Sequence, residues 1–185
     1  GSRSGEDLTT GDFNVFIGDY AGHAILYGNK NIAIGHNAMA ANLTTDGSVA
    51  IGYLALAEIT DAVGCTAIGL NSGLNVTTAD YNTGLGYNTL GGNSTTDLTG
   101  NRNTAIGASA GRDLEGVGNE NTFVGDSSGI TVTTGNENTL LGAATDTSAV
   151  NGTNQTAIGY GTVGKGGNTV TLGNSDVTDV YMAFD

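Results

Sequence analysis

The residues best suited to catalysis are few and stand apart in this sequence. It holds two histidines, His23 and His36, and one cysteine, Cys65. Neither histidine stands in a metal-ligand spacing such as HExxH, so both are predicted to be loop or surface residues. Cys65 has no second cysteine to pair with, which excludes an intrachain disulfide and a cysteine-based zinc site. We therefore expect no metal site and no cofactor.

A glycine-rich stretch, GLGYNTLGG at 84–92, superficially resembles a phosphate-binding loop. It lacks the GxGxxG spacing, and the same letters arise from a repeat that runs through the chain. Carboxylate pairs for glycoside hydrolysis could still meet across subunits, an alternative that the sequence leaves open. The absence of any other convergent set of groups predicts a protein that is not an enzyme.

The composition indicates a regular array that would have to position any functional side chain. The chain of 185 residues has 32 glycines, no proline and no tryptophan, and its 38% hydrophobic residues recur at fixed intervals, which disfavours disorder. Five basic against 18 acidic residues give a formal net charge of −13, so nucleic acids and anionic membranes are poor partners. No apolar run approaches the length of a membrane span, so membrane insertion is not expected.

The repeat is defined by a glycine that follows a short apolar run, as in NIAIG and NTAIG. Six of the nine intervals between these glycines are 17 residues long, and one longer interval contains a four-residue insertion between Gly91 and Thr99. A period of this kind is typical of a solenoid. We call these residues the anchor glycines and predict a structural role for all ten: Gly18, Gly35, Gly52, Gly69, Gly86, Gly107, Gly125, Gly142, Gly159 and Gly173.

The three residues that directly precede each anchor glycine form three columns along the repeat. The residue just before the glycine is always a large aliphatic, such as Ile34, and we expect it to face the core. Two residues earlier, on the same strand face, stand β-branched residues such as Thr104. The column between them points the other way, carries no charge and is therefore expected to be covered too. It is mostly alanine: Ala33, Ala50, Ala67, Ala105 and Ala157.

Asparagine forms a further column one residue before each predicted strand, often within a GNxN unit such as GNRN at 100–103. Asparagine and glycine tolerate left-handed backbone, and stacked amides can hydrogen-bond from coil to coil. The unit is therefore predicted to be the corner that leads into each strand. Cys65 occupies this column as a variation of the repeat.

A 17-residue coil has room for a second short strand, expected in segments such as AILY at 24–27 and ITVTT at 130–134. The core of such a coil is thin and buries little surface against the entropy of ordering the chain. Association of copies through the alanine column would cover both sheet faces. We therefore expect a homo-oligomer.

The units SVAIGY at 48–53, NTAIG at 103–107 and QTAIGY at 155–160 resemble the repeats of trimeric autotransporter adhesin heads and of related tail fibres from phages and phage-like injection systems. The closing NTVTLGNSDVTDVYM at 168–182 is similar to the segment that precedes an endosialidase-type intramolecular chaperone in many tail fibres. The resemblance covers nearly the whole chain and implies a left-handed parallel β-roll in a homotrimer. Two features depart from these families: the coils are longer than those of the best-known adhesin heads, and no chaperone domain follows Asp185. Between the adhesin heads and the tail fibres, we favour the tail fibres.

The expected architecture is all-β: a parallel left-handed β-roll or solenoid of about ten 17-residue coils. Residues 1–4 are expected to be a tag scar and leader, 5–167 the solenoid repeats, and 168–185 a modified terminal coil with a C-terminal stub. The predicted function is a structural and receptor-binding segment of an extracellular trimeric tail fibre or surface adhesin. An ice-binding solenoid and a glycan-cleaving tailspike are the alternatives. Candidate contacts for a glycan or protein receptor are Tyr53, Tyr87 and Tyr160, which directly follow anchor glycines.

Overall fold

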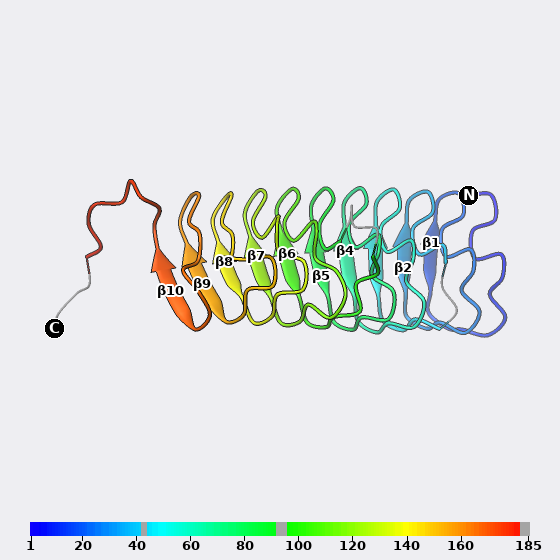
Figure 1. Ribbon diagram of the computed structural model, residues 1–185. Helices are drawn as coiled ribbons and strands as arrows, with labels where there is room; N and C mark the ends of the chain where they lie inside the picture. The colour runs from blue at the N-terminus through cyan, green and yellow to red at the C-terminus, as the bar shows by residue number, and fades with distance from the viewer. Residues whose placement is uncertain (42–43, 92–95, 182–185) are drawn as a thin grey trace.

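The computed structural model describes residues 1–41, 44–91 and 96–181, which wind into a β-solenoid of about nine turns with one strand in each coil (Figure 1). All the strands lie in one sheet, each paired in parallel with the next in chain order, so the predicted all-β parallel solenoid is confirmed. The strands are β1 (Val15–Ile17), β2 (Ile32–Ile34), β3 (Val49–Ile51), β4 (Thr66–Ile68), β5 (Thr83–Leu85), β6 (Thr104–Ile106), β7 (Thr122–Val124), β8 (Thr139–Leu141), β9 (Gln155–Ile158) and β10 (Thr169–Leu172).

The sheet register follows the period of the sequence. Ile17 pairs with Ile34, and Ile34 pairs with Ile51. The inserted residues between β5 and β6 do not disturb this pairing, because Leu85 still lies opposite Ile106. Residues 92–95 of that insertion lie outside the described residues. The chain leaves the coils after β10 and runs away from them (Figure 1).

The second strand expected in each coil is absent from the described residues. The segments at 24–27 and 130–134 are turns and bends. Backbone hydrogen bonds such as Thr133 N–H to the Val150 carbonyl, at 2.8 Å, and isolated parallel bridges such as Val76 to Leu98 connect the coils along this wall. Each coil is therefore closed by turns and not by a second sheet.

The two faces of the sheet are the reverse of those expected from the sequence. Ala33, Ala50 and Ala105 are fully buried inside their own coil, whereas Ile17 is 56% and Leu85 44% exposed. The prediction that the aliphatic column forms the core is wrong, as is the expectation that the alanine column faces a partner. The opposite wall of each coil supplies large buried side chains of its own, so the strand has room inside for only a small residue.

Volume compensation within the coil explains the exceptions in the alanine column. Phe123 is fully buried at this position, and a Cβ added to either Gly111 or Gly129 would lie 2.7 Å from its ring. Where the strand instead carries Gly84, the buried Ser72 and Thr89 hydroxyls lie 2.7 Å from a Cβ built on that glycine, and Leu90 lies 3.4 Å from it. Large residues on one wall thus meet small residues on the other, as close packing requires.

The asparagine column is a ladder of buried amides, as predicted. Asn121 donates from Nδ2 to the Gly135 carbonyl at 2.8 Å, and its Oδ1 accepts the backbone N–H of Asn138 at 3.1 Å. The same pattern joins Asn103 to Asn121, at 2.9 Å. The left-handed residue of the corner is the one before the asparagine, such as Arg102 at φ 57°. The asparagine itself satisfies the backbone groups that the corner leaves unpaired.

The anchor glycines meet a requirement of both conformation and space. Gly107 has φ 127°, and a Cβ built on it would lie 2.5 Å from the carbonyl oxygen of Gly125, the next anchor glycine. A side chain at this position would clash with the backbone of the following coil. The coils can stack at strand spacing only because this column has no side chains.

Candidate functional site

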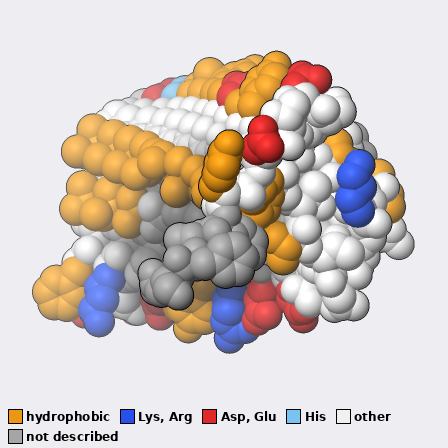
Figure 2. All heavy atoms as spheres, turned by 90° about the vertical axis from the view of Figure 1, so that its left-hand side faces the viewer, with side chains coloured by type: hydrophobic (Ala, Val, Ile, Leu, Met, Phe, Trp, Pro, Cys, Tyr) orange, Lys and Arg blue, Asp and Glu red, His pale blue; other side chains and the backbone are white. Residues whose placement is uncertain are grey.

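The outer face of the single sheet is a regular surface that runs along all the strands. One of its columns contains the aliphatic residues before the anchor glycines, and the other contains valine and isoleucine in β1–β3 and threonine in β4–β9. Exposed members of the aliphatic column include Ile68, Ile106 and Leu141. Figure 2 shows hydrophobic side chains gathered in parallel rows along one flank of the molecule. We call this surface the outer sheet face.

The candidate tyrosines lie beside the outer sheet face, in the column that follows the anchor glycines. Tyr53 and Tyr87 are 50% and 52% exposed and follow β3 and β5, so a single coil separates them. Tyr160 follows β9, about 19 Å further along at a strand spacing of about 4.8 Å. The structure therefore brings together two of the three tyrosines but not the third.

Both histidines lie near the N-terminal end and carry partial exposure, as predicted for loop or surface residues. His36 stacks on the Tyr53 ring with centroids 5.5 Å apart and an interplanar angle of 13°. His23 Nε2 lies 3.6 Å from a carboxylate oxygen of Glu6. No group of three or more His, Cys, Asp and Glu residues in the described part of the chain could hold a metal ion.

Cys65 is a structural residue of the asparagine column. It is fully buried, and its Sγ donates to the Ala79 carbonyl at 3.0 Å. Burial raises the pKa of its thiol to about 11, so the thiolate needed for nucleophilic attack is not formed at neutral pH. The residue therefore behaves as the sequence predicts, as a variant of the ladder.

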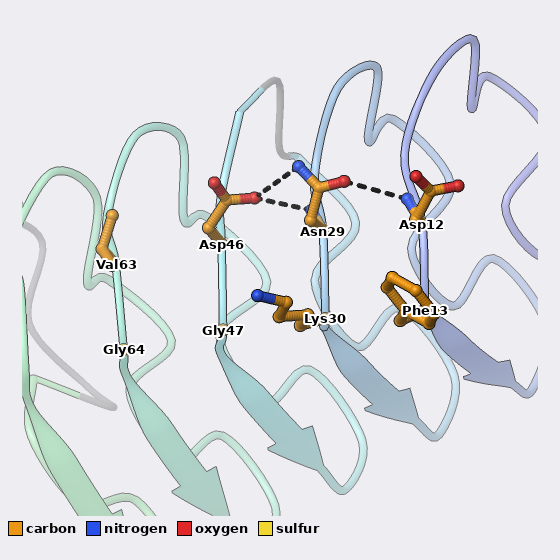
Figure 3. A pocket seen from close by; sticks show the side chains of 8 residues that line it. All are labelled: Asp12, Phe13, Asn29, Lys30, Asp46, Gly47, Val63 and Gly64. Atoms are coloured by element: carbon orange, nitrogen blue, oxygen red, sulfur yellow. Dashed lines mark hydrogen bonds between the residues drawn. The ribbon is translucent and has the colours of Figure 1, made fainter.

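A second ladder of hydrogen bonds runs along the exposed side of the corners. Asn29 Oδ1 accepts the Asp12 backbone N–H at 2.9 Å, and Asp46 Oδ1 accepts the Asn29 backbone N–H at 2.6 Å (Figure 3). Val63 holds the next place and has no side-chain acceptor, although its own N–H donates to Asp80 Oδ1 at 2.8 Å. The corners around Val63 therefore combine polar and apolar groups.

The residues that follow this ladder form the left-handed corner column, which includes Phe13, Lys30, Gly47, Gly64 and Tyr81. The two adjacent glycines leave a hollow with a cavity volume of about 430 Å³. We call this hollow the corner trough. It is lined by Asp12, Phe13, Asn29, Lys30, Asp46, Gly47, Val63 and Gly64 (Figure 3).

Side chains from the neighbouring coils lie over the two glycines of the corner trough. The Lys30 side chain extends from its own coil toward the coil of Gly47 (Figure 3). A Cβ added to Gly64 would lie 2.9 Å from a ring carbon of Tyr81, so this ring covers that glycine. A Cβ added to Gly47 would meet nothing within 4 Å, so the floor is open there.

The corner trough is not evident from the sequence alone. Its signal is the third position of the GNxN unit, where two successive repeats have glycine between a lysine and a tyrosine. The repeat predicts only a corner at that position, because a gap in one column becomes a cavity only after the coils are stacked in register.

Comparison of the chain with family models, with curated proteins and with solved structures finds no match in any of the three. No helix in the described ranges is long and apolar enough to cross a membrane.

Proposed function

We propose that this chain is a structural and receptor-binding segment of a homotrimeric tail fibre or surface adhesin, which attaches a phage or phage-like particle to a cell surface. The outer sheet face is the observation that carries the proposal. Its two columns continue over all ten strands, and Ile17, Leu85, Leu141 and Leu172 are 44–56% exposed on it.

The area of this face supports association. We estimate its exposed area to be on the order of 1,000 Å², whereas the largest apolar patch of a typical monomer is roughly 300–600 Å². A standard protein interface buries about 800 Å² on each partner. The face is also free of charged residues along β1–β10, so packing it against another copy would leave no charge unpaired.

Association is supported by where the apolar residues lie, but not by the total accessible surface area of the chain. The accessible surface is 8478 Å², and a folded monomer of this mass is expected to expose roughly 8,200 Å². The coil is therefore not short of buried surface, and thinness alone does not require a partner. What needs a partner is the concentration of aliphatic side chains on one flat face.

Three copies are favoured over two by the resemblance of the NTAIG and SVAIGY units to trimeric adhesin heads and tail fibres. Closed cyclic symmetry places the same face of every copy at the axis and leaves no face to extend the assembly sideways. The left-handed winding and the extracellular location belong to the same resemblance. In this assembly the outer sheet faces meet at the axis and the corners point outward.

Light scattering coupled to gel filtration tests this assembly. We expect a mass about three times the 18.4 kDa of one chain at micromolar concentration. A folded monomer over the same range of concentration would contradict it. Incubation with bacterial surface polysaccharides, with analysis of the products, tests the accompanying expectation that the chain is not an enzyme, which any turnover would contradict.

An ice-binding solenoid is a second candidate because the threonine column faces outward and not into the core. Threonine belongs to the outer sheet face in six successive strands, β4 to β9, beside an aliphatic column. A flat array of hydroxyl and methyl groups, repeating about every 4.8 Å along the axis, is suited to ordering water. Both candidates use the same face, so thermal hysteresis from a monomer would favour ice binding, and a trimer without hysteresis would exclude it.

A further inference from the structure

We propose that the corner trough binds one neutral hexose unit of a cell-surface glycan. The inference rests on the proposed receptor-binding function, but it concerns the exposed corners and not the outer sheet face. Its carriers are the open floor at Gly47, the Lys30 ammonium, and the side wall formed by Asp46 and Val63. The Tyr81 ring is not part of the lining but covers the neighbouring Gly64.

The trough offers the mixed surface that a sugar ring needs. Val63 is 38% and Tyr81 54% exposed, and these side chains can contact the C–H faces of a pyranose. The Lys30 ammonium can donate to hydroxyl oxygens, and the Asp46 carboxylate can accept from hydroxyl groups. A cavity of about 430 Å³ also lies within the range of small-ligand sites.

The polar groups of the trough remain available to a ligand. Lys30 is exposed, and it forms no ion pair with any residue in the described ranges. Asp46 uses Oδ1 for its bonds to Asn29, at 2.6 Å to the backbone N–H and 3.2 Å to Nδ2. These bonds leave Asp46 Oδ2 to accept from a ligand hydroxyl.

The charge of the trough favours a neutral ligand over an acidic one. Asp12 and Asp46 contribute two carboxylates against the single ammonium of Lys30. The whole chain carries a formal net charge of −13, which repels anions further. A carboxylated sugar would place a third negative charge between the two aspartates, whereas hydroxyl groups can pair with both the carboxylates and the ammonium.

The side chains around the trough occupy a costly backbone position without gaining burial. Phe13 and Tyr81 have φ of 63° and 58°, a left-handed conformation that costs a side chain about 1–2 kcal/mol. Elsewhere in this column Arg102 and Glu120 form an ion pair at 3.6 Å, which gives these side chains a partner. Phe13 and Tyr81 remain exposed, and contact with a ligand would account for their aromatic side chains.

A glycan array and two substitutions test the site. On an array of oligosaccharides that end in neutral hexoses or in carboxylated sugars, we expect binding to neutral hexoses only. Gly47→Asn fills the open floor with a residue that tolerates left-handed backbone, as Asn154 does at φ 49° in the same column. We expect Gly47→Asn and Tyr81→Asn each to lower the affinity for the bound oligosaccharide at least tenfold in a calorimetric titration.

The matched control is Glu137→Asn, at φ 58° in the same column but several coils away, which should leave the affinity unchanged. The proposal would be overturned by an array that shows no binding or binding only to carboxylated sugars. It would also be overturned if both trough variants kept their affinity, or if the control lost as much affinity as they did. The mass of every sample, measured by light scattering, tests the trimer independently of sugar binding. A trimer without hexose binding contradicts the trough alone, and a monomer that binds hexose contradicts the trimer alone.

Discussion

Gly107 shows how a single residue sets the spacing of the coils. We expect Gly107→Ala to lower the free energy of unfolding by at least about 3 kcal/mol, because the added Cβ combines an unfavourable φ with a backbone clash. Urea denaturation followed by circular dichroism measures the change. Gly116→Ala is the control, since its Cβ would meet only a Thr134 methyl at 3.7 Å. Equal losses in the two variants would refute the explanation from coil stacking.

Asp146 provides a pH-dependent contribution to stability. Burial raises the pKa of its carboxyl, although hydrogen bonds from Thr131 and Thr147 partly offset the effect. A raised pKa in the folded state means that this group's contribution to stability falls as pH rises from the usual Asp pKa, about 3.9, through the raised value. As pH rises across this range, the wild type should therefore lose unfolding free energy relative to Asp146→Asn. Urea titrations of both proteins at pH 3.5 and 6 measure it, and a shift in favour of the wild type would contradict the assignment.

At the scale of the elements, the buried asparagine ladder holds each corner to the next. Asn121→Ala removes the partners of the Gly135 carbonyl and of the Asn138 backbone N–H, both in buried residues. We expect a loss of about 2–6 kcal/mol in unfolding free energy, since each of the two buried groups left unpaired costs about 1–3 kcal/mol.

Asn119→Ala is the matched control for this ladder. Asn119 lies two residues earlier on the outer ladder and is only half-buried, so water can replace its bonds. Its replacement should cost about 1 kcal/mol or less on the same denaturation curve. A larger loss for Asn119→Ala than for Asn121→Ala would show that the buried ladder is not the stabilising one.

The strands and their parallel order could be predicted from the sequence, but the direction of their faces could not. Alternation assigns Ile34 and Ala33 to opposite faces, and it does not state which face is inside. Size suggested that the isoleucine is buried, yet the inward space is already filled by residues such as Ile25 and Leu56 from the turns. Those residues lie outside the strands, so the alternation within the strands does not predict that they fill the core.

The reversal also changes which substitutions probe assembly. Ala50 and Ala67 are 0% and 1% exposed inside their own coils. Aspartate at these positions would place charges in the core of a single chain and unfold it, whatever its oligomeric state. Substitutions on the outer sheet face are the ones that separate folding from association.

At the scale of the whole molecule, the candidate site could be predicted only in part. Tyr53 and Tyr87 are exposed on two coils with one coil between them, as the repeat suggests, whereas the trough beside Lys30 depends on how successive corners stack. The assembled particle would present these surfaces three times, and multivalency would raise its avidity for a repeated surface glycan.

The central claim is that the outer sheet face is where the copies meet, and the mass of an Ile51→Asp, Ile68→Asp double variant tests it most directly. Both side chains belong to that face, in successive strands β3 and β4. The control is Tyr27→Asp with Thr78→Asp, which adds two acids at exposed positions away from the strands. By light scattering we expect about three chain masses for the wild type and the control, and one chain mass of 18.4 kDa, with the β-rich spectrum retained, for the face variant. The same mass for all three proteins would contradict the account.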